Sequence, residues 1–141
     1  MLDARVLFLD STGGAGPEHD PSVPQRAARN IARLLPGHPL VGITAWGNDS
    51  LEVLGWSNRL AEQLEHAQSR CPDTPGLDVA RSGDPVLVGN LSAERRWEEY
   101  REQLLAHGMR SLYCQPLVAE TQLLGLLTLY SEREYAFRLR P

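Results

Sequence analysis

The sequence predicts an α+β domain built on a mainly antiparallel sheet, and three features of the chain support this fold class. Residues 111–119 and 123–130 are uncharged, apolar strand-like runs joined by the polar turn 120–122, which is typical of an antiparallel hairpin. Residues 40–46 and 51–56 form a second pair of such runs across a Gly-Asn-Asp-Ser turn. Most other apolar residues recur at helical spacing, so the predicted helices are segregated from the predicted hairpins.

Residues 1–22 are predicted to be a flexible lead-in to a single domain of residues 23–141. Gly and Pro are frequent in this stretch, and only residues 6–9 are apolar enough to form a short strand. The Gly-Gly-Ala-Gly run at residues 13–16 lacks the Lys and Ser or Thr that complete a phosphate-binding loop, so we interpret it as an ordinary loop. Asp10 also lacks the lysine that aspartyl-phosphate sites use.

Four helices are predicted from apolar residues at helical spacing. They lie at residues 23–35, 58–70, 77–82 and 93–107. Ser22 is expected to cap the first helix, with Pro24 in its first turn, and Pro36 stops it. A brief strand is expected at residues 85–88, and Gly108 follows the last helix as its C-terminal glycine.

The hairpin of residues 111–131 is the most apolar part of the chain and is rich in Leu, Val, Tyr and Thr. Such runs cannot face water on both sides, so we expect this hairpin at the centre of a covered sheet. Pro116 removes one backbone donor from the ladder, which indicates a bulge or the end of regular pairing near it.

The composition is that of an ordinary soluble globular protein, with 42% hydrophobic and 23% charged residues. A net charge of −4 opposes nucleic-acid binding, which needs clustered positive charge. No run approaches the roughly 20 apolar residues of a membrane helix, and the N-terminus has no signal-peptide pattern. The two cysteines, Cys71 and Cys114, give no disulfide framework, so we expect free thiols in a reducing cytoplasm.

Five short phrases occur in the order and spacing of one protein family. They are TPGLDVARSGDPVLVGNL at residues 74–91, RWEEY at 96–100, GMRS at 108–111 leading to Pro116-Leu117, GLLTLYS at 125–131, and Ala136-Phe137. Through these phrases, about residues 40–137 resemble a GAF domain of the kind common in actinobacterial regulators.

The resemblance implies a PAS/profilin-like α+β architecture, with a central antiparallel sheet and helices on both faces. It implies a helix pair on one face and a small-molecule pocket on the other. The short helices and loops between about residues 58 and 110 would roof that pocket.

The chain departs from the family pattern at two places. Family members carry a helix after the Ala-Phe phrase that packs with the first helix and often dimerises or relays a signal, whereas this chain stops at Pro141. We therefore expect residues 23–141 to form a GAF-like domain without that helix, which is either missing or was cut off with a downstream output domain. The cysteine of the family phrase is replaced by Gly76, so no functional cysteine is assigned to this chain.

The candidate pocket residues are aromatic or polar-tipped side chains on the predicted strands and the last helix. They are Trp46, Trp56, Trp97, Ser111, Tyr113, Thr128 and Tyr130. The tryptophans suit either plain core or a pocket wall, whereas the hydroxyl groups could orient a ligand by hydrogen bonds. Alternation places Ser111 with Tyr113 on one face and Thr128 with Tyr130 on one face. The unknown register leaves open whether the two pairs share a face.

No catalytic residue, metal site or cofactor is predicted. One GAF-like family reduces free methionine sulfoxide with cysteines, but this chain lacks the cysteines of its pattern. Cys114 lies mid-strand, where a buried inert thiol is expected. The four histidines show no zinc-binding spacing, and no cysteine stands beside a histidine as in bilin-attaching domains.

The leading hypothesis is a non-catalytic sensory or regulatory GAF module in the cytoplasm. It would bind a small molecule or a partner, form a homodimer, and relay the signal to an output domain in cis or in trans, in transcriptional or two-component signalling. The second hypothesis is a degenerate GAF domain that serves only as a dimerisation scaffold. Its interface would be the first-helix stripe of Ala27, Ile31, Leu34 and Leu35. The third is an enzyme built on Asp10 or the cysteines.

Overall fold

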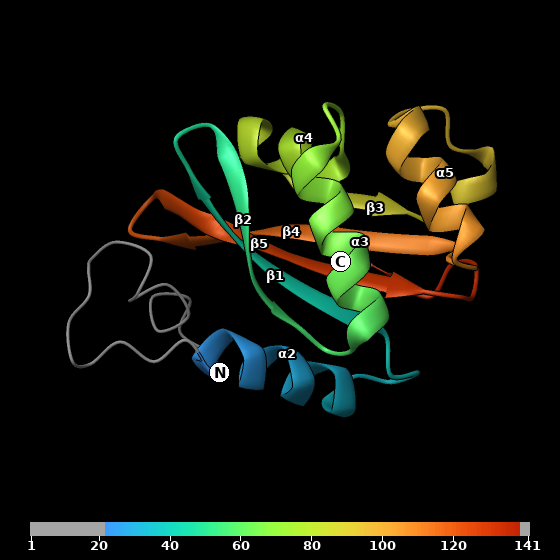
Figure 1. The fold of residues 1–141 in the computed structure, drawn as a ribbon, viewed down its shortest axis with the longest axis horizontal. Helices are drawn as coiled ribbons and strands as arrows, with labels where there is room; N and C mark the ends of the chain where they lie inside the picture. The colour runs from blue at the N-terminus through green and yellow to red at the C-terminus, as the bar shows by residue number, and fades with distance from the viewer. Residues whose placement is uncertain (1–21, 139–141) are drawn as a thin grey trace.

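The fold is an antiparallel sheet with helices on both of its faces (Figure 1). The computed structural model describes residues 22–138, so Asp10, the predicted strand at residues 6–9 and the glycine-rich run at residues 13–16 lie outside the described residues. Within the described range, the order of helices and strands is the predicted one. None of its helices is long and apolar enough to cross a membrane.

The sheet has the strand order β2-β1-β5-β4-β3, and every neighbouring pair is antiparallel. Its strands are β1 (Leu40–Gly47), β2 (Ser50–Trp56), β3 (Val86–Val88), β4 (Ser111–Ala119) and β5 (Gln122–Ser131). The middle strand is β5, which pairs with β1 on one side and with β4 on the other. The predicted central position of the second hairpin is therefore confirmed.

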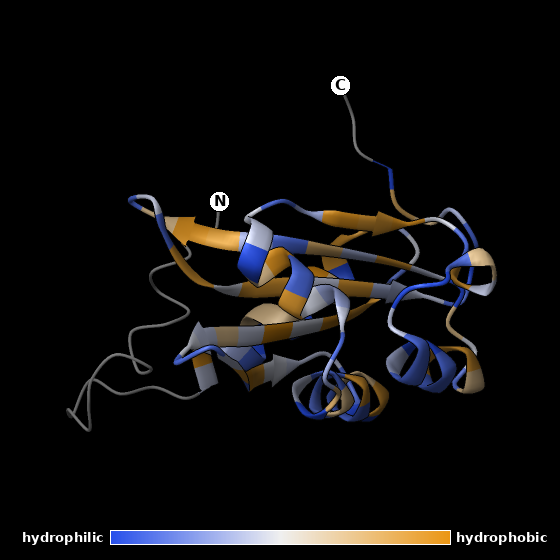
Figure 2. Cartoon of the chain, turned by 90° about the horizontal axis from the view of Figure 1, so that it is seen from above, coloured by the Kyte–Doolittle hydropathy of each residue, from blue (hydrophilic) through white to orange (hydrophobic). Residues whose placement is uncertain are grey.

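The helices form a layer on each side of this sheet. They are α2 (Ser22–Leu34), α3 (Arg59–Arg70), α4 (Pro75–Ser82) and α5 (Glu98–Ala106), with a 3-10 helix, η1 (Leu91–Ala93), before α5. Helix α2 packs on one face of β1 and β2, and α3 packs on the opposite face of the same strands. Helix α4 covers β4 and β5 on the α3 side, and α5 packs against α3. Figure 2 shows apolar residues gathered in the strands, with the C-terminal segment on the side away from α3 and α5.

Both hairpins are closed by two-residue turns whose residues have positive φ angles. The first turn consists of Asn48 (φ 53°) and Asp49 (φ 57°), and the second of Glu120 (φ 52°) and Thr121 (φ 67°). Positive φ at both positions defines a type I′ turn, whose twist matches that of two paired strands. Gln122 therefore belongs to β5, and the predicted three-residue turn is one residue too long.

The pairing of β4 with β5 changes register once, between Leu117 and Val118. Leu117 lies opposite Gly125, whereas Val118 lies opposite Leu123, so Leu124 is an extra residue on β5. This β-bulge follows Pro116 by one residue, and the sequence predicts a bulge near this proline because it has no N–H to donate.

The helix predicted over residues 93–107 begins only at Glu98. The carboxylate of Glu94 accepts hydrogen bonds from the backbone N–H groups of the next two residues and from the Arg96 guanidinium. Because these local bonds satisfy donors outside a helix, they compete with an earlier helix start. Trp97 then adopts a left-handed conformation (φ 55°), and the helix follows it.

The other helix ends follow ordinary capping chemistry. The sequence allows Ser57 or Asn58 to cap α3, and in the structure the Asn58 side chain accepts the Ala61 N–H at 2.8 Å. Helix α4 starts at Pro75 rather than at Leu77, because Thr74 Oγ1 accepts the Leu77 N–H at 3.2 Å and proline fits the first helical position. Gly83 ends α4 in a left-handed conformation (φ 80°).

Two glycines of the first hairpin allow helices to approach the sheet closely. A Cβ atom at Gly55 would lie 2.5 Å from the carbonyl oxygen of Pro24 in α2. A Cβ atom at Gly42, on the other face, would overlap the carboxyl group of Glu65 in α3. The absence of side chains at these positions therefore decides how near α2 and α3 come to the strands.

Candidate functional site

The bulge places the two predicted polar pairs on opposite faces of the sheet. Thr128 lies opposite Cys114, which neighbours Tyr113 along β4 and so points the other way. Thr128 and Tyr130 consequently face α3, α4 and α5. Ser111 and Tyr113 face the side on which α2 lies.

A buried polar cluster lies between the sheet and the helices α3 and α5. We call Glu65, Gln68, Tyr100 and Tyr130 the Glu65 cluster, and none of them exposes more than 1% of its surface. The Tyr130 hydroxyl donates to Oε2 of Glu65. The hydroxyl oxygens of Tyr100 and Tyr130 are 2.8 Å apart, and Tyr100 also donates to the Leu64 carbonyl at 3.1 Å.

The carboxyl group of Glu65 is not neutralised by any cation within residues 22–138. Burial raises the pKa of Glu65 to about 7, and the hydrogen bonds with Tyr130 and Gln68 oppose that rise. Among the described residues, neither Glu65 Oε1 nor Thr44 Oγ1 on the same sheet face has a hydrogen-bond partner, although both atoms are buried. Buried polar atoms are normally paired, so these two atoms are exceptions on this face of the sheet.

The cluster connects the helices of this face to one another. The amide nitrogen of Gln68 donates to Glu65 Oε2 at 3.4 Å. The amide oxygen of Gln68 accepts the backbone N–H of Gly76 in α4 at 2.7 Å. Beneath α4, the Thr128 hydroxyl donates to Cys114 Sγ at 3.4 Å. Burial raises the pKa of the Cys114 thiol to about 12. A displacement of side chains in the cluster would therefore change the hydrogen bonds that join α3 to α4 and to α5.

The three predicted tryptophans lie on the face covered by α3, α4 and α5, each in a different packing environment. Trp97 is 5% exposed, and its Nε1 donates to Asp78 Oδ2 at 2.9 Å, which joins the start of α5 to α4. Trp46 packs with the small core group beneath α4. The ring of Trp56 packs at a tilt against His66, with 6.2 Å between ring centroids.

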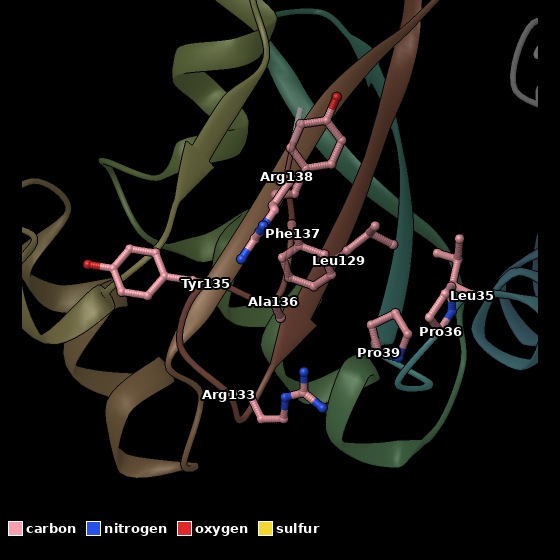
Figure 3. A pocket seen from close by; sticks show the side chains of 10 residues that line it. Leu35, Pro36, Pro39, Leu129, Arg133, Tyr135, Ala136, Phe137 and Arg138 are labelled. Carbon is pink, nitrogen blue, oxygen red and sulfur yellow. The ribbon is translucent and has the colours of Figure 1, made fainter. Parts of the chain in front are cut away.

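The opposite face of the sheet carries a groove of about 920 Å³ between the end of α2 and the C-terminal segment (Figure 3). Its lining residues are Leu35, Pro36, Pro39, Tyr113, Leu129, Arg133, Tyr135, Ala136, Phe137 and Arg138. Of the predicted pocket residues, Tyr113 alone lines it. The Ala-Phe phrase at residues 136–137 marks this wall of the groove in the sequence. The alternation of the strands does not predict a groove beside it.

Ser111 holds the C-terminal wall of this groove and does not line it. Its hydroxyl donates to the Arg133 carbonyl at 2.6 Å and accepts the Ala136 N–H at 3.4 Å. The predicted hydrogen-bonding ability of Ser111 is thus used within the protein itself.

The predicted dimer stripe of α2 is divided between the protein's own core and its surface. Ala27 is buried, and Ile31 and Leu35 pack partly buried against the strands. Leu34 is 83% exposed. Of the four side chains, Leu34 is the one most available to a second copy.

In the described part of the chain, the cysteines are free thiols and no metal-binding group is present. Cys71 and Cys114 are both buried and free. Burial raises the pKa of the Cys71 thiol, and the nearby Glu99 carboxylate raises it further. Within residues 22–138, no three His, Cys, Asp or Glu side chains are grouped so that they could hold a metal ion.

Comparison with known proteins yields one family and several solved structures. A family model described as the GAF domain matches residues 18–140. The GAF domain region of a protein from Geobacter sulfurreducens PCA is 17% identical, with a TM-score of 0.64 over 83% of this chain and 81% of that one. No curated protein sequence matches the chain.

Two further structures come from different functional classes. A domain from Sinorhizobium meliloti 1021, assigned to a two-component sensor histidine kinase, is 20% identical, with a TM-score of 0.60 over 80% of this chain and 74% of that one. The type II free methionine-R-sulfoxide reductase from Thermoplasma acidophilum is 16% identical, with a TM-score of 0.65 over 81% of this chain and 75% of that one. At such identities the likeness establishes the fold.

Proposed function

Because the chain belongs to the GAF domain family, we propose that it is a non-catalytic sensory module that binds a small molecule and passes the change to an output domain. The output domain would act in transcriptional or two-component signalling and would be attached in cis or recruited in trans. The observation that carries the proposal is the Glu65 cluster beneath α3, α4 and α5.

Stability alone does not account for this cluster. A fully buried carboxyl group without a cation is unfavourable compared with apolar packing, and an unpaired buried oxygen adds to the penalty. A small molecule that offers N–H or O–H donors to Glu65 Oε1 would remove that penalty. We therefore propose a ligand rich in hydrogen-bond donors, such as a nucleobase.

The same cluster provides the means of relay. Glu65 and Gln68 belong to α3, Tyr100 belongs to α5, and Gln68 holds the start of α4 through Gly76. Side chains fill this space, so a ligand would have to shift the helices relative to the sheet. That shift is the conformational change that we propose to be transmitted.

We propose no cysteine chemistry for this module and place it in the cytoplasm. Burial raises the pKa of both thiols, so they are poor nucleophiles near neutral pH. Two free cysteines suit a reducing compartment. Reduction of free methionine sulfoxide that disappears in a Cys71→Ser variant would overturn this part of the proposal.

A thermal-shift and native mass-spectrometry screen against nucleotides, aromatic acids and haem tests the sensing function. At a ligand concentration of about 100 times Kd, binding stabilises the folded state by about 2.7 kcal/mol, so Tm should rise by several degrees. We expect Glu65→Gln to abolish the shift for a ligand of the cluster, because the amide cannot accept the same set of donors.

The exposed Glu102→Gln variant in α5 is the matched control and should keep the full shift. The sensing function is wrong if no compound raises Tm or forms a complex under any condition. The site is wrong if a binding compound stabilises wild type and Glu65→Gln equally.

A further inference from the structure

The groove beside α2 lies on the sheet face opposite the Glu65 cluster, so a molecule bound there would not touch that cluster. Its floor is formed by Leu129 of β5 and Tyr113 of β4, and one rim by Pro36 and Pro39 after α2. Phe137 forms the facing wall and lies close to Leu129 in the close view (Figure 3). A volume of about 920 Å³ is within the size range of small-molecule sites.

The C-terminal wall is held in place by several hydrogen bonds before any ligand binds. Ser111 is hydrogen-bonded to the backbone on both sides of the turn that leads to Phe137. The Tyr135 N–H donates to the Gly89 carbonyl at 2.8 Å, and the Arg110 N–H donates to the Ser131 carbonyl at 2.8 Å. Such preorganisation reduces the entropy lost on binding.

The charged side chains that line the groove are positive. Arg133 and Arg138 line it, and none of the described lining residues is acidic. Glu132 precedes Arg133 in the same segment, but it points toward the α5–β4 turn, with Oε1 4.0 Å from a Cβ position at Gly108. In Figure 3, Arg133 lies near Pro39 at one end of the groove.

We propose that this groove binds a small carboxylate with an aromatic or branched apolar body. The apolar body would cover Leu129 and Phe137. The carboxylate would pair with Arg133 at the Pro39 end of the groove, and Arg138 would add positive charge to the opposite end. Guanidinium groups match carboxylates in geometry as well as charge, and apolar walls with a few polar groups are typical of such sites. The acidic ligand suits this face, because the arginines lie here and the Glu65 cluster lies on the other face.

Titration calorimetry of the full chain with 4-phenylbutyrate tests the proposal, with 4-phenylbutan-1-ol as the neutral comparison. We expect saturable binding of the acid that is at least about tenfold tighter than that of the alcohol, since a charge-assisted hydrogen bond is stronger than a neutral one. High salt should weaken binding of the acid more than that of the alcohol.

Variants locate the site. Arg133→Gln should weaken binding of 4-phenylbutyrate about tenfold, and Arg138→Gln should weaken it less, whereas Arg95→Gln, an exposed arginine before α5, should not weaken it. Ala136→Trp should block the groove without changing its charge. Undetectable binding of the acid, equal affinity for acid and alcohol, or full affinity in both arginine variants would overturn the proposal. Binding that Glu65→Gln removes and Arg133→Gln leaves intact would also overturn it, while leaving the sensing function in place.

Discussion

Three polar contacts link Glu65 through the hydroxyls of Tyr130 and Tyr100 to the Leu64 carbonyl. Tyr130 donates to Glu65 Oε2, and Tyr100 donates to the Leu64 carbonyl. Burial of the Glu65 carboxyl group raises its pKa, so the folded protein favours the neutral form more than the unfolded chain does.

This protonation gives the free energy of unfolding a defined pH dependence. The pKa of Glu65 is about 7 in the folded protein against an ordinary 4.5, so the folded state binds the proton more tightly. The contribution of Glu65 is therefore fully present below pH 4.5, decreases as pH rises to about 7, and is lost above it, a change of about 3 kcal/mol. Urea unfolding across this pH range measures it.

The variants Glu65→Gln and Glu102→Gln separate this effect from other titrations. Glutamine cannot ionise, and its amide oxygen can accept the hydrogen bond from Tyr130, so Glu65→Gln should lose most of the pH dependence above pH 4.5 while Glu102→Gln keeps it. Glu94 acts in another range, because hydrogen bonds from Arg96 lower its pKa to about 2. An unchanged slope in Glu65→Gln would contradict the assignment.

At the scale of elements, the approach of α3 to β1 depends on a missing side chain. Gly42 lies directly beneath the Glu65 carboxyl group, and the strand there has no room for a Cβ atom. The near approach places Glu65 within reach of Tyr130 on the next strand, β5. The polar cluster thus exists because a strand glycine faces a helix glutamate.

We expect Gly42→Ala to lower the free energy of unfolding by about 1–3 kcal/mol through overpacking. In a Glu65→Ala background the same substitution should have little effect, because the overlapping carboxyl group is gone. Chemical denaturation of the four proteins of this cycle gives the coupling.

Gly47→Ala, in the same strand but with open space around its Cβ position, is the matched control and should change stability little. An equal loss from Gly42→Ala in both backgrounds would show that the backbone of β1, and not Glu65, resists the extra methyl group.

At the scale of the whole molecule, the sheet separates two faces of different character. The α3 side is closed over an apolar core that contains the Glu65 cluster, whereas the α2 side is covered over β1 and β2 and carries the groove beyond them. The proposed homodimer would use the outer surface of α2, where Leu34 is exposed.

We expect Leu34→Glu to convert a dimer to a monomer in light scattering without changing Tm, because that side chain is 83% exposed. Ile31→Glu should instead lower Tm, since it places a charge against the sheet. A dimer that persists in Leu34→Glu would place the interface elsewhere, and a monomeric wild type would remove the proposal.

The sequence predicted the elements well where local chemistry decided them. Alternation and turn residues located both hairpins, and Asn58 marked the start of α3. The predicted start of α5 was wrong because Glu94 accepts hydrogen bonds from neighbouring N–H groups, and because Trp97 donates to Asp78, which belongs to α4. The spacing of apolar residues gives no sign of these hydrogen bonds.

The sequence by itself determined the α+β fold, the central hairpin and the GAF family, because period, turn chemistry and short phrases are local. Only the tertiary structure decided which face each polar residue occupies. Without the extra residue Leu124, Tyr113 would lie opposite Thr128 and share its face. The bulge shifts the register by one residue, and since side chains alternate with a period of two, that shift moves Tyr113 to the groove and leaves Thr128 in the interior.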